Sequence, residues 1–312
     1  MHWEQKILIT GVPRSGTTFT GKCISLSRDI LYLWEPFNSK SRRRLTQFYP
    51  YVGPSSSPDK REWYRNFVSD TLKLRKLKST KTLNPTDPFF IKIIKHAGIN
   101  RSYLKYKRSQ LQALLNPNTT ILIKDPASFF LTEFLIQEFD FKTIVVIRHP
   151  AAVSLSRKKL NWRFNPDWWY QKDLYQDRIA DLMRNYDMTN SDIHSESALI
   201  WMAAYDYLLE LHEKYPHHIR FVTHENLCIH PHKEFEDIFT YLNLSYTQQI
   251  RKAIDKYTSG QDTITQHGDL SIVQAKNALE LVDKWKRELS KDEIDHIQSL
   301  VNDSNAFNRF YV

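Results

Sequence analysis

The sequence contains few cysteines and no long apolar segment. Only two cysteines, Cys23 and Cys228, occur among its 312 residues, which excludes a disulfide framework and is typical of a reducing compartment. No apolar run approaches the roughly 20 residues that a membrane-spanning helix needs, and the N-terminal residues lack the pattern of a signal peptide. We therefore expect a cytoplasmic protein without a membrane span.

Glycine is scarce as well, and its distribution is informative. Three of the seven glycines, Gly11, Gly16 and Gly21, lie close together near the start of the chain. Where glycine is rare, such a cluster indicates backbone that turns tightly or approaches a ligand closely. The remaining composition, with 41% hydrophobic and 25% charged residues, indicates a folded chain that buries a sizeable core.

Positive charge is concentrated in one segment. Lysine and arginine total 44 against 35 aspartate and glutamate residues, a net charge of +9. Residues 40–108 alone hold 18 basic and 4 acidic side chains, so the rest of the chain is acidic overall. This segment is typical of a solvated basic face, of a surface that attracts anionic substrates, or of a nucleic-acid-binding or anionic-surface-binding module.

Short apolar runs, most of them rich in β-branched residues, predict five buried strands. They lie at residues 7–10, 30–34, 120–124, 143–147 and 219–223. Helical patterns fall between several of them, for example at residues 129–139 and 195–213. Further helices are expected after the loop at 53–58 through about residue 78, and at 275–287 and 291–301. This alternation predicts an α/β fold with a doubly wound, mainly parallel five-stranded sheet.

No linker-like boundary divides the chain, so we expect a single domain over residues 1–312. Two insertions interrupt the alternation of strands and helices. The first is the basic one at about 36–118, and the second, at about 160–190, contains Trp162, Trp168 and Trp169.

Residues 11–18 follow the first predicted strand and precede a helical pattern. Their sequence, GVPRSGTT, has the glycine spacing of a phosphate-binding loop, in which backbone N–H groups and a helix N-terminus converge on an anion. Thr17 occupies the position at which an ATPase has lysine, and the nearest cation is Arg14. Because that lysine neutralises charge on the β- and γ-phosphates, this loop suits a smaller and less charged group better than a magnesium triphosphate.

A second anion-binding pattern lies at residues 146–159. Arg148 ends a predicted strand, Pro150 suits the first turn of the next helix, and Ser156 lies about two turns into that helix. A forked guanidinium and a hydroxyl in this arrangement can bind a phosphate.

Together, these two segments resemble those of the sulfotransferases that use 3′-phosphoadenosine 5′-phosphosulfate (PAPS). The sequence PRSGTT is similar to their loop for the 5′-phosphosulfate, and Arg148 with Ser156 is similar to their 3′-phosphate site. The segment YLWEPF at 32–37 is similar to the Tyr-Glu-Pro segment of carbohydrate sulfotransferases, whereas His224 stands where the family has tyrosine. The resemblance implies a P-loop nucleotide-kinase-like fold.

The implied activity is in-line transfer of a sulfuryl group from PAPS to a hydroxyl or amine of a small-molecule or saccharide acceptor, without a required metal and with the desulfated nucleotide PAP as product. Arg14 is then expected on the leaving-group side, and Lys124 near the sulfonate. The 5′-phosphate is expected to be held by Ser15, Gly16, Thr17 and Thr18.

The general base is expected to be Glu35, because it follows the second strand and so lies at the carboxyl edge of the sheet, where ligands of open α/β sheets bind. Asp125 is the rival base. Another alternative is that Glu35 only orients an arginine.

Two other function classes stay open from the sequence. Residues 121–125, ILIKD, also fit a strand that ends in a magnesium-binding aspartate, as in a P-loop small-molecule kinase, although Thr17 and the Arg148–Ser156 pair argue against it. The basic segment would be the footprint of a nucleic-acid-binding module. The five histidines between 217 and 232 have no regular ligand spacing, so no metal site is predicted.

Overall fold

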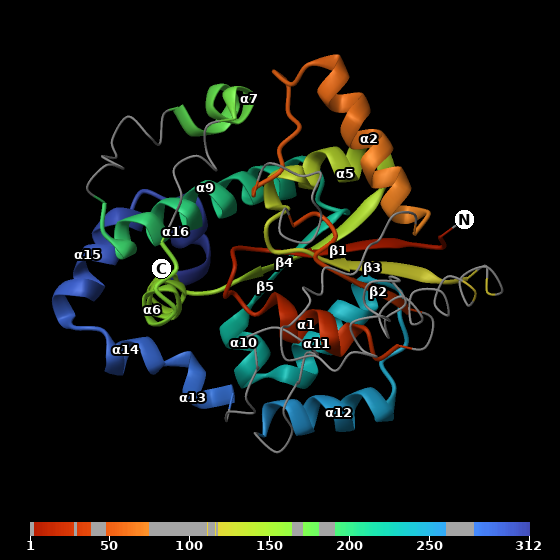
Figure 1. Cartoon of the computed structure of the whole chain (residues 1–312). Helices are drawn as coiled ribbons and strands as arrows, with labels where there is room; N and C mark the ends of the chain where they lie inside the picture. Colours follow the sequence, from red (N-terminus) through yellow and green to blue (C-terminus); the bar gives the residue numbers. More distant parts are fainter. Residues whose placement is uncertain are drawn as a thin grey trace, which may run out of the picture.

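The structure is a computed structural model, and it describes residues 3–27, 30–38, 48–74, 111, 116, 118–163, 171–180, 191–259 and 278–312. Within these residues, five parallel strands form one sheet in the order β2-β3-β1-β4-β5 (Figure 1). Their bounds are β1 Lys6–Thr10, β2 Ile30–Trp34, β3 Thr120–Lys124, β4 Phe141–Ile147 and β5 Ile219–Thr223.

Helices cover both faces of this sheet. The longer ones are α1 Thr17–Ile24, α2 Pro58–Leu72, α5 Thr132–Phe139, α6 Pro150–Lys159, α9 Ile193–Lys214, α11 Pro231–Tyr241, α12 Gln248–Thr258 and α15 Lys291–Val301. The shorter ones are η1 Phe129–Leu131, α7 Lys172–Leu174, η3 Tyr175–Ile179, α10 His224–Ile229, α13 Ala278–Val282, α14 Lys284–Glu288 and α16 Asn305–Tyr311. Figure 1 shows α2, α5 and α9 above the sheet and α1, α11 and α12 below it.

Alternation of side chains along the strands divides the core into layers. Leu8 packs in the cluster that includes α2 and α5, whereas Ile7 and Ile9 pack in the cluster of α1, α11 and α12. All three side chains are fully buried, because β1 is the central strand and is covered on both faces. Burial of such a side chain contributes about 1.5–3 kcal/mol relative to leaving it exposed.

The predicted α/β fold and its five parallel strands are confirmed. Strands β2, β3 and β5 have the predicted bounds, β1 begins one residue earlier, and β4 begins two residues earlier. The predicted helix at 195–213 is α9, and the one at 291–301 is α15. Among the described residues, no helix has both the length and the apolar character to cross a membrane.

Three predicted helices differ in detail. The helix expected through residue 78 ends at Leu72, because Leu74 adopts a left-handed conformation with φ of 53°. The helix at 129–139 begins as the 3-10 turn η1 before it becomes α5. The helix expected at 275–287 is divided at Asp283 into α13 and α14, and Trp285 of α14 stacks on His149.

Candidate active site

The loop between β1 and α1 depends on two glycines. Gly11 and Gly16 have φ values of 139° and 101°, which side chains rarely tolerate. A Cβ atom added to Gly11 would lie 2.3 Å from the carbonyl oxygen of Val146, and one added to Gly16 would lie 2.5 Å from the ring of His224. The loop therefore passes so close to β4 and α10 that only glycine fits at these two positions.

Helix α1 begins directly after this loop, at Thr17. Gly16 is the N-cap residue and has no side chain with which to cap the helix, so the first N–H groups keep their capacity to bind an anion. Ser15 and Thr17 are buried, and Thr18 is partly exposed. These features agree with the predicted anion-binding loop, which stays a prediction.

The structure brings Arg14 to the second predicted site. The Arg14 Nε donates a hydrogen bond to the Ser156 hydroxyl at 2.8 Å. The Arg148 Nη1 donates to the carbonyl oxygen of Arg14 at 3.2 Å. Burial lowers the pKa of Arg14, and the positive charge of Arg148 lowers it further. Two guanidinium groups thus lie close together beside the loop, an arrangement that an anion between them would stabilise.

Arg148 also has an unused donor. Its Nη2 donates to the carbonyl oxygen of Leu281 at 3.2 Å, while its buried Nε has no hydrogen-bond partner in the described part of the chain. Burial lowers the pKa of Arg148, and the carboxylate of Glu225 opposes this effect. Because buried donors are almost always hydrogen-bonded, this Nε is an exception among the described residues.

Glu35 and Lys124 form a buried ion pair at the ends of β2 and β3. The Lys124 side chain is 1% exposed and that of Glu35 is 16% exposed. The Lys124 ammonium lies 3.2 Å from the ring centroid of Trp34, and the second carboxylate oxygen of Glu35 accepts a hydrogen bond from Asn38 at 2.9 Å. Burial lowers the pKa of Lys124, and Glu35 opposes this effect.

Asp125, the rival base, is completely buried and organises two turns. Its carboxylate accepts hydrogen bonds from the backbone N–H of Phe37 at 2.7 Å and of Ala127 at 3.2 Å. Burial raises the pKa of Asp125 to about 7, with a further contribution from Glu35. A carboxylate that is closed to solvent and engaged on both oxygens is poorly placed to meet a substrate.

The two groups of predicted residues lie at the same edge of the sheet. Arg14 follows β1, Glu35 follows β2, Lys124 ends β3 and Arg148 follows β4, and in a parallel sheet these carboxyl ends form the ligand-binding edge. Among the described residues, no hydrogen bond or ion pair joins Glu35 or Lys124 to Arg14, Arg148 or Ser156. The structure therefore assembles two sub-sites along one edge.

Two residues that contact this site were not predicted from the sequence. Tyr205 accepts a hydrogen bond from the N–H of Val12 in the loop, and the Trp201 indole donates one to the carbonyl oxygen of Arg148. Both belong to the apolar pattern of α9. The one signal in the sequence is that two aromatic residues with polar atoms lie four positions apart on a face that is expected to be buried, where each needs a partner.

Several other predicted features lie partly outside the described residues. Most of the basic segment, at 39–47 and 75–110, is not described, and neither are Trp168 and Trp169. Trp162 is 46% exposed, and the guanidinium of Arg14 lies 5.7 Å from its ring centroid. Within the described ranges, no group of three histidine, cysteine or acidic side chains is arranged to hold a metal.

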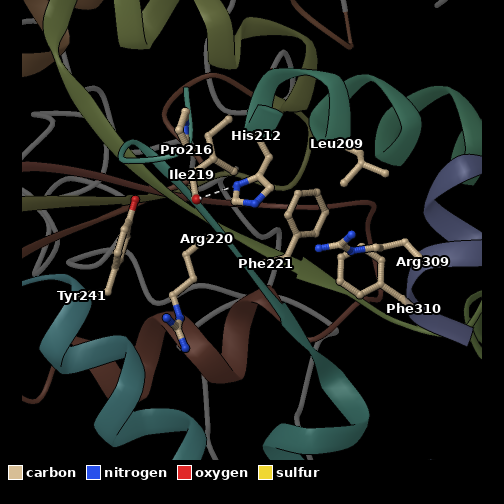
Figure 2. A pocket seen from close by; sticks show the side chains of 9 residues that line it. All are labelled: Leu209, His212, Pro216, Ile219, Arg220, Phe221, Tyr241, Arg309 and Phe310. Atoms are coloured by element: carbon tan, nitrogen blue, oxygen red, sulfur yellow. Dashed lines mark hydrogen bonds between the residues drawn. The ribbon is translucent and has the colours of Figure 1, made fainter. Parts of the chain in front are cut away.

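A cavity of about 350 Å³ lies beside β5, at the outer edge of the sheet (Figure 2). Its lining comprises Leu209, His212, Pro216, Ile219, Arg220, Phe221, Tyr241, Arg309 and Phe310. None of these is a predicted site residue. In Figure 2 the side chains of Arg220 and Arg309 point in different directions and do not converge on one position.

The family model described as "Sulfotransferase family" matches residues 6–248. The chain therefore belongs to the sulfotransferase family, and the predicted family is confirmed. No curated protein matches the chain.

Solved structures with a similar fold are sulfotransferases of low sequence identity. The sulfotransferase domain from the curacin biosynthetic pathway is 16% identical with a TM-score of 0.49, and the match covers 97% of this chain and 99% of that one. Mouse sulfotransferase SULT7A1, solved in complex with PAP, is 13% identical with a TM-score of 0.44, over 96% and 84% of the two chains. Sulfotransferase STF9 from Mycobacterium avium is 13% identical with a TM-score of 0.47, over 99% and 77%.

Proposed function

We propose that this sulfotransferase uses PAPS as donor and transfers its sulfuryl group to a hydroxyl or amine of a small-molecule or saccharide acceptor. The observation that carries the proposal is the contact between the two predicted phosphate sites. Arg14 of the loop lies 2.8 Å from Ser156 of α6, and Arg148 binds the backbone of Arg14. A donor with phosphates on both sides of its ribose needs two anion sites on adjacent strands, and this contact between the two segments supports the proposal.

The loop at residues 11–18 and the Arg148–Ser156 pair have separate binding roles in this proposal. The N–H groups and hydroxyls of the loop would hold the 5′-phosphate, and Arg14 would stabilise the charge that develops on it. Arg148 and Ser156 would hold the 3′-phosphate through the forked guanidinium and the hydroxyl. The loop residues concerned are Ser15, Gly16, Thr17 and Thr18.

When bound, PAPS supplies a sulfuryl group with one negative charge, so no metal ion is required to screen the transferred group. The bond between sulfur and the phosphate oxygen breaks with its electron pair leaving on PAP, while a bond forms between sulfur and the acceptor oxygen or nitrogen. The proton of the acceptor passes to the carboxylate of Glu35, and Lys124 lies next to that carboxylate.

The assignment of Glu35 as base is supported by contrast with Asp125. Both carboxylates accept hydrogen bonds on both oxygens, but Glu35 is 16% exposed and lies beyond the end of β2, whereas Asp125 is completely buried. The complete burial of Asp125 separates it from a solvated magnesium ion, which disfavours the kinase alternative.

Arg148→Ala tests the donor assignment. We expect the dissociation constant of PAP to rise about 10- to 100-fold, because charge-assisted hydrogen bonds to a phosphate are lost. Binding of adenosine 5′-phosphate, which lacks the 3′-phosphate, should change far less. Isothermal calorimetry measures both.

Lys159→Ala is the matched control, because Lys159 is an exposed cation of α6 that pairs with Glu288. It should bind both nucleotides as the wild type does. An equal loss of affinity for both nucleotides in Arg148→Ala would remove the 3′-phosphate assignment. PAPS-dependent turnover in a screen of sugar, phenol and amine acceptors then identifies the acceptor class.

A further inference from the structure

Helix α9 presents two buried aromatic side chains to the backbone of both phosphate sites. Trp201 and Tyr205 are four residues apart and so lie on the same helical face. Their rings form a T-shaped contact with centroids 4.9 Å apart. Both side chains are 0% exposed, so the indole N–H and the phenol O–H each need a hydrogen-bond partner within the protein.

Tyr205 bridges the position at which β1 and β4 separate. The register of these strands ends with the pair Thr10 and Val145. Immediately beyond it, the Tyr205 hydroxyl accepts a hydrogen bond from the N–H of Val12 at 3.1 Å and donates one to the carbonyl of Val146 at 2.8 Å. One phenol oxygen therefore replaces a direct backbone hydrogen bond and sets the separation between the loop and β4.

Trp201 lies one helical turn before Tyr205 and contacts the backbone of Arg148, in the proposed 3′-phosphate site. Its Nε1 donates to the carbonyl oxygen of Arg148 at 2.8 Å. This carbonyl belongs to the residue whose guanidinium binds Arg14 and Leu281. The indole therefore fixes the backbone from which the Arg148 side chain projects towards the loop.

We propose that Tyr205 and Trp201 are positioning residues that set the geometry of the donor site through α9. The inference rests on the proposed use of PAPS. Tyr205 holds the loop against β4, so it acts on the binding of any nucleotide with a 5′-phosphate. Trp201 holds Arg148, so it acts mainly on the 3′-phosphate. The two residues therefore affect the binding of the two kinds of nucleotide differently, and a merely structural role would produce neither effect.

The test compares the binding of PAP and of adenosine 5′-phosphate to Tyr205→Phe and Trp201→Phe by calorimetry. Tyr205→Phe should weaken the binding of both nucleotides about tenfold, because the N–H of Val12 and the carbonyl of Val146 lose their hydrogen-bond partner. Trp201→Phe should weaken the binding of PAP about tenfold and the binding of adenosine 5′-phosphate much less. Tyr207→Phe is the control: Tyr207 is a buried tyrosine of the same helix and packs against Phe130 rather than the loop.

The possible outcomes separate this inference from the proposed function. Wild-type protein that does not bind PAP would overturn the donor assignment and this inference together. Wild-type binding, with Tyr205→Phe and Trp201→Phe both as tight as Tyr207→Phe for both nucleotides, would overturn the inference alone, even if their free energies of unfolding decreased. If Trp201→Phe does not fold, Tyr205→Phe decides the proposal, because it removes a single oxygen atom.

Discussion

Lys124 lies in a position where its charge needs compensation. Its side chain is 1% exposed and pairs with Glu35, and its ammonium also faces the ring of Trp34. Removal of one partner of a buried ion pair costs several kcal/mol, because the other charge is left without compensation. Substitution of Glu35 is therefore expected to destabilise the fold in addition to removing the proposed base, and an experiment must separate the two effects.

Glu35→Gln separates them when turnover is expressed per folded molecule. The amide keeps the shape of the side chain but cannot accept the acceptor's proton, so we expect kcat to fall by about 100-fold or more. The dissociation constant of PAP should stay close to that of the wild type, because Glu35 has no hydrogen bond or ion pair with either proposed phosphate site. Steady-state kinetics, calorimetry and urea unfolding provide the three measurements.

Glu138→Gln is a suitable control for this variant. Glu138 pairs with Arg65 on the surface, and such pairs contribute about 0–1 kcal/mol, so turnover should not change. Near-normal turnover in Glu35→Gln would instead transfer the role of base to Asp125.

At the scale of elements, the start of α6 depends on a neutral histidine. The Nδ1 of His149 accepts the N–H of Ala151 at 3.2 Å, and its ring stacks on Trp285 of α14 with centroids 4.1 Å apart. Burial lowers the pKa of His149 to about 4, and the charges of Lys286 and Arg148 contribute to the shift. Protonation of Nδ1 therefore removes the acceptor of the helix cap and places a charge in a buried position beside two other cations.

This shift predicts a pH dependence of stability. A histidine whose pKa is lower in the folded state binds its proton more tightly when the chain is unfolded. Its contribution to stability is therefore complete above pH 6.5 and is lost as the pH falls towards 4, by at most about 1.4 kcal/mol per pH unit. His149→Asn keeps a capping acceptor but does not titrate, so the stability advantage of the wild type should shrink over this range.

Urea unfolding of both proteins at a series of pH values measures this advantage. The comparison removes the contributions of other titrating groups, because both proteins share them. A difference in unfolding free energy that stays constant between pH 7 and about 4 would contradict a lowered pKa at His149.

Elements with a strong local pattern could be predicted from the sequence. All five strands were predicted because buried parallel strands are continuous apolar runs bounded by turn residues. The ends of helices were less predictable. Leu74 in a left-handed conformation ends α2, and the division at Asp283 separates α13 from α14; neither carries the glycine or proline that marks a break in a sequence.

In the candidate site, too, the local motifs could be predicted from the sequence, whereas the contacts between distant residues could not. The loop and the Arg148 segment are contiguous motifs, so their elements and order followed from the sequence. The contact of Arg14 with Ser156 joins residues 142 positions apart, and Tyr205 meets Val12 across 193 positions. Such contacts depend on how α6 and α9 pack on the sheet, which no local pattern specifies.

At the scale of the whole molecule, the described parts of the two insertions contact each other. Tyr51 donates a hydrogen bond to Asp177 at 2.7 Å, and Lys60 forms an ion pair with Asp173 at 2.6 Å. Acidic residues of the tryptophan-rich insertion therefore bind the segment before and within α2, which belongs to the basic insertion. These contacts agree with the expectation of a single domain, which stays a prediction.

The response of the whole molecule to nucleotides distinguishes the two enzyme classes that the sequence left open. A ligand that binds only the folded state at about 100 times its Kd adds about 2.7 kcal/mol to stability, which raises the Tm of a chain of this size by several degrees. We expect PAP to do so in the presence of a chelator, because Arg14 and Arg148 supply the positive charge at the site. ATP with magnesium should have a much smaller effect, since Thr17 replaces the loop lysine. A larger shift with magnesium ATP than with PAP, measured by differential scanning fluorimetry, would favour the kinase alternative over the proposed donor.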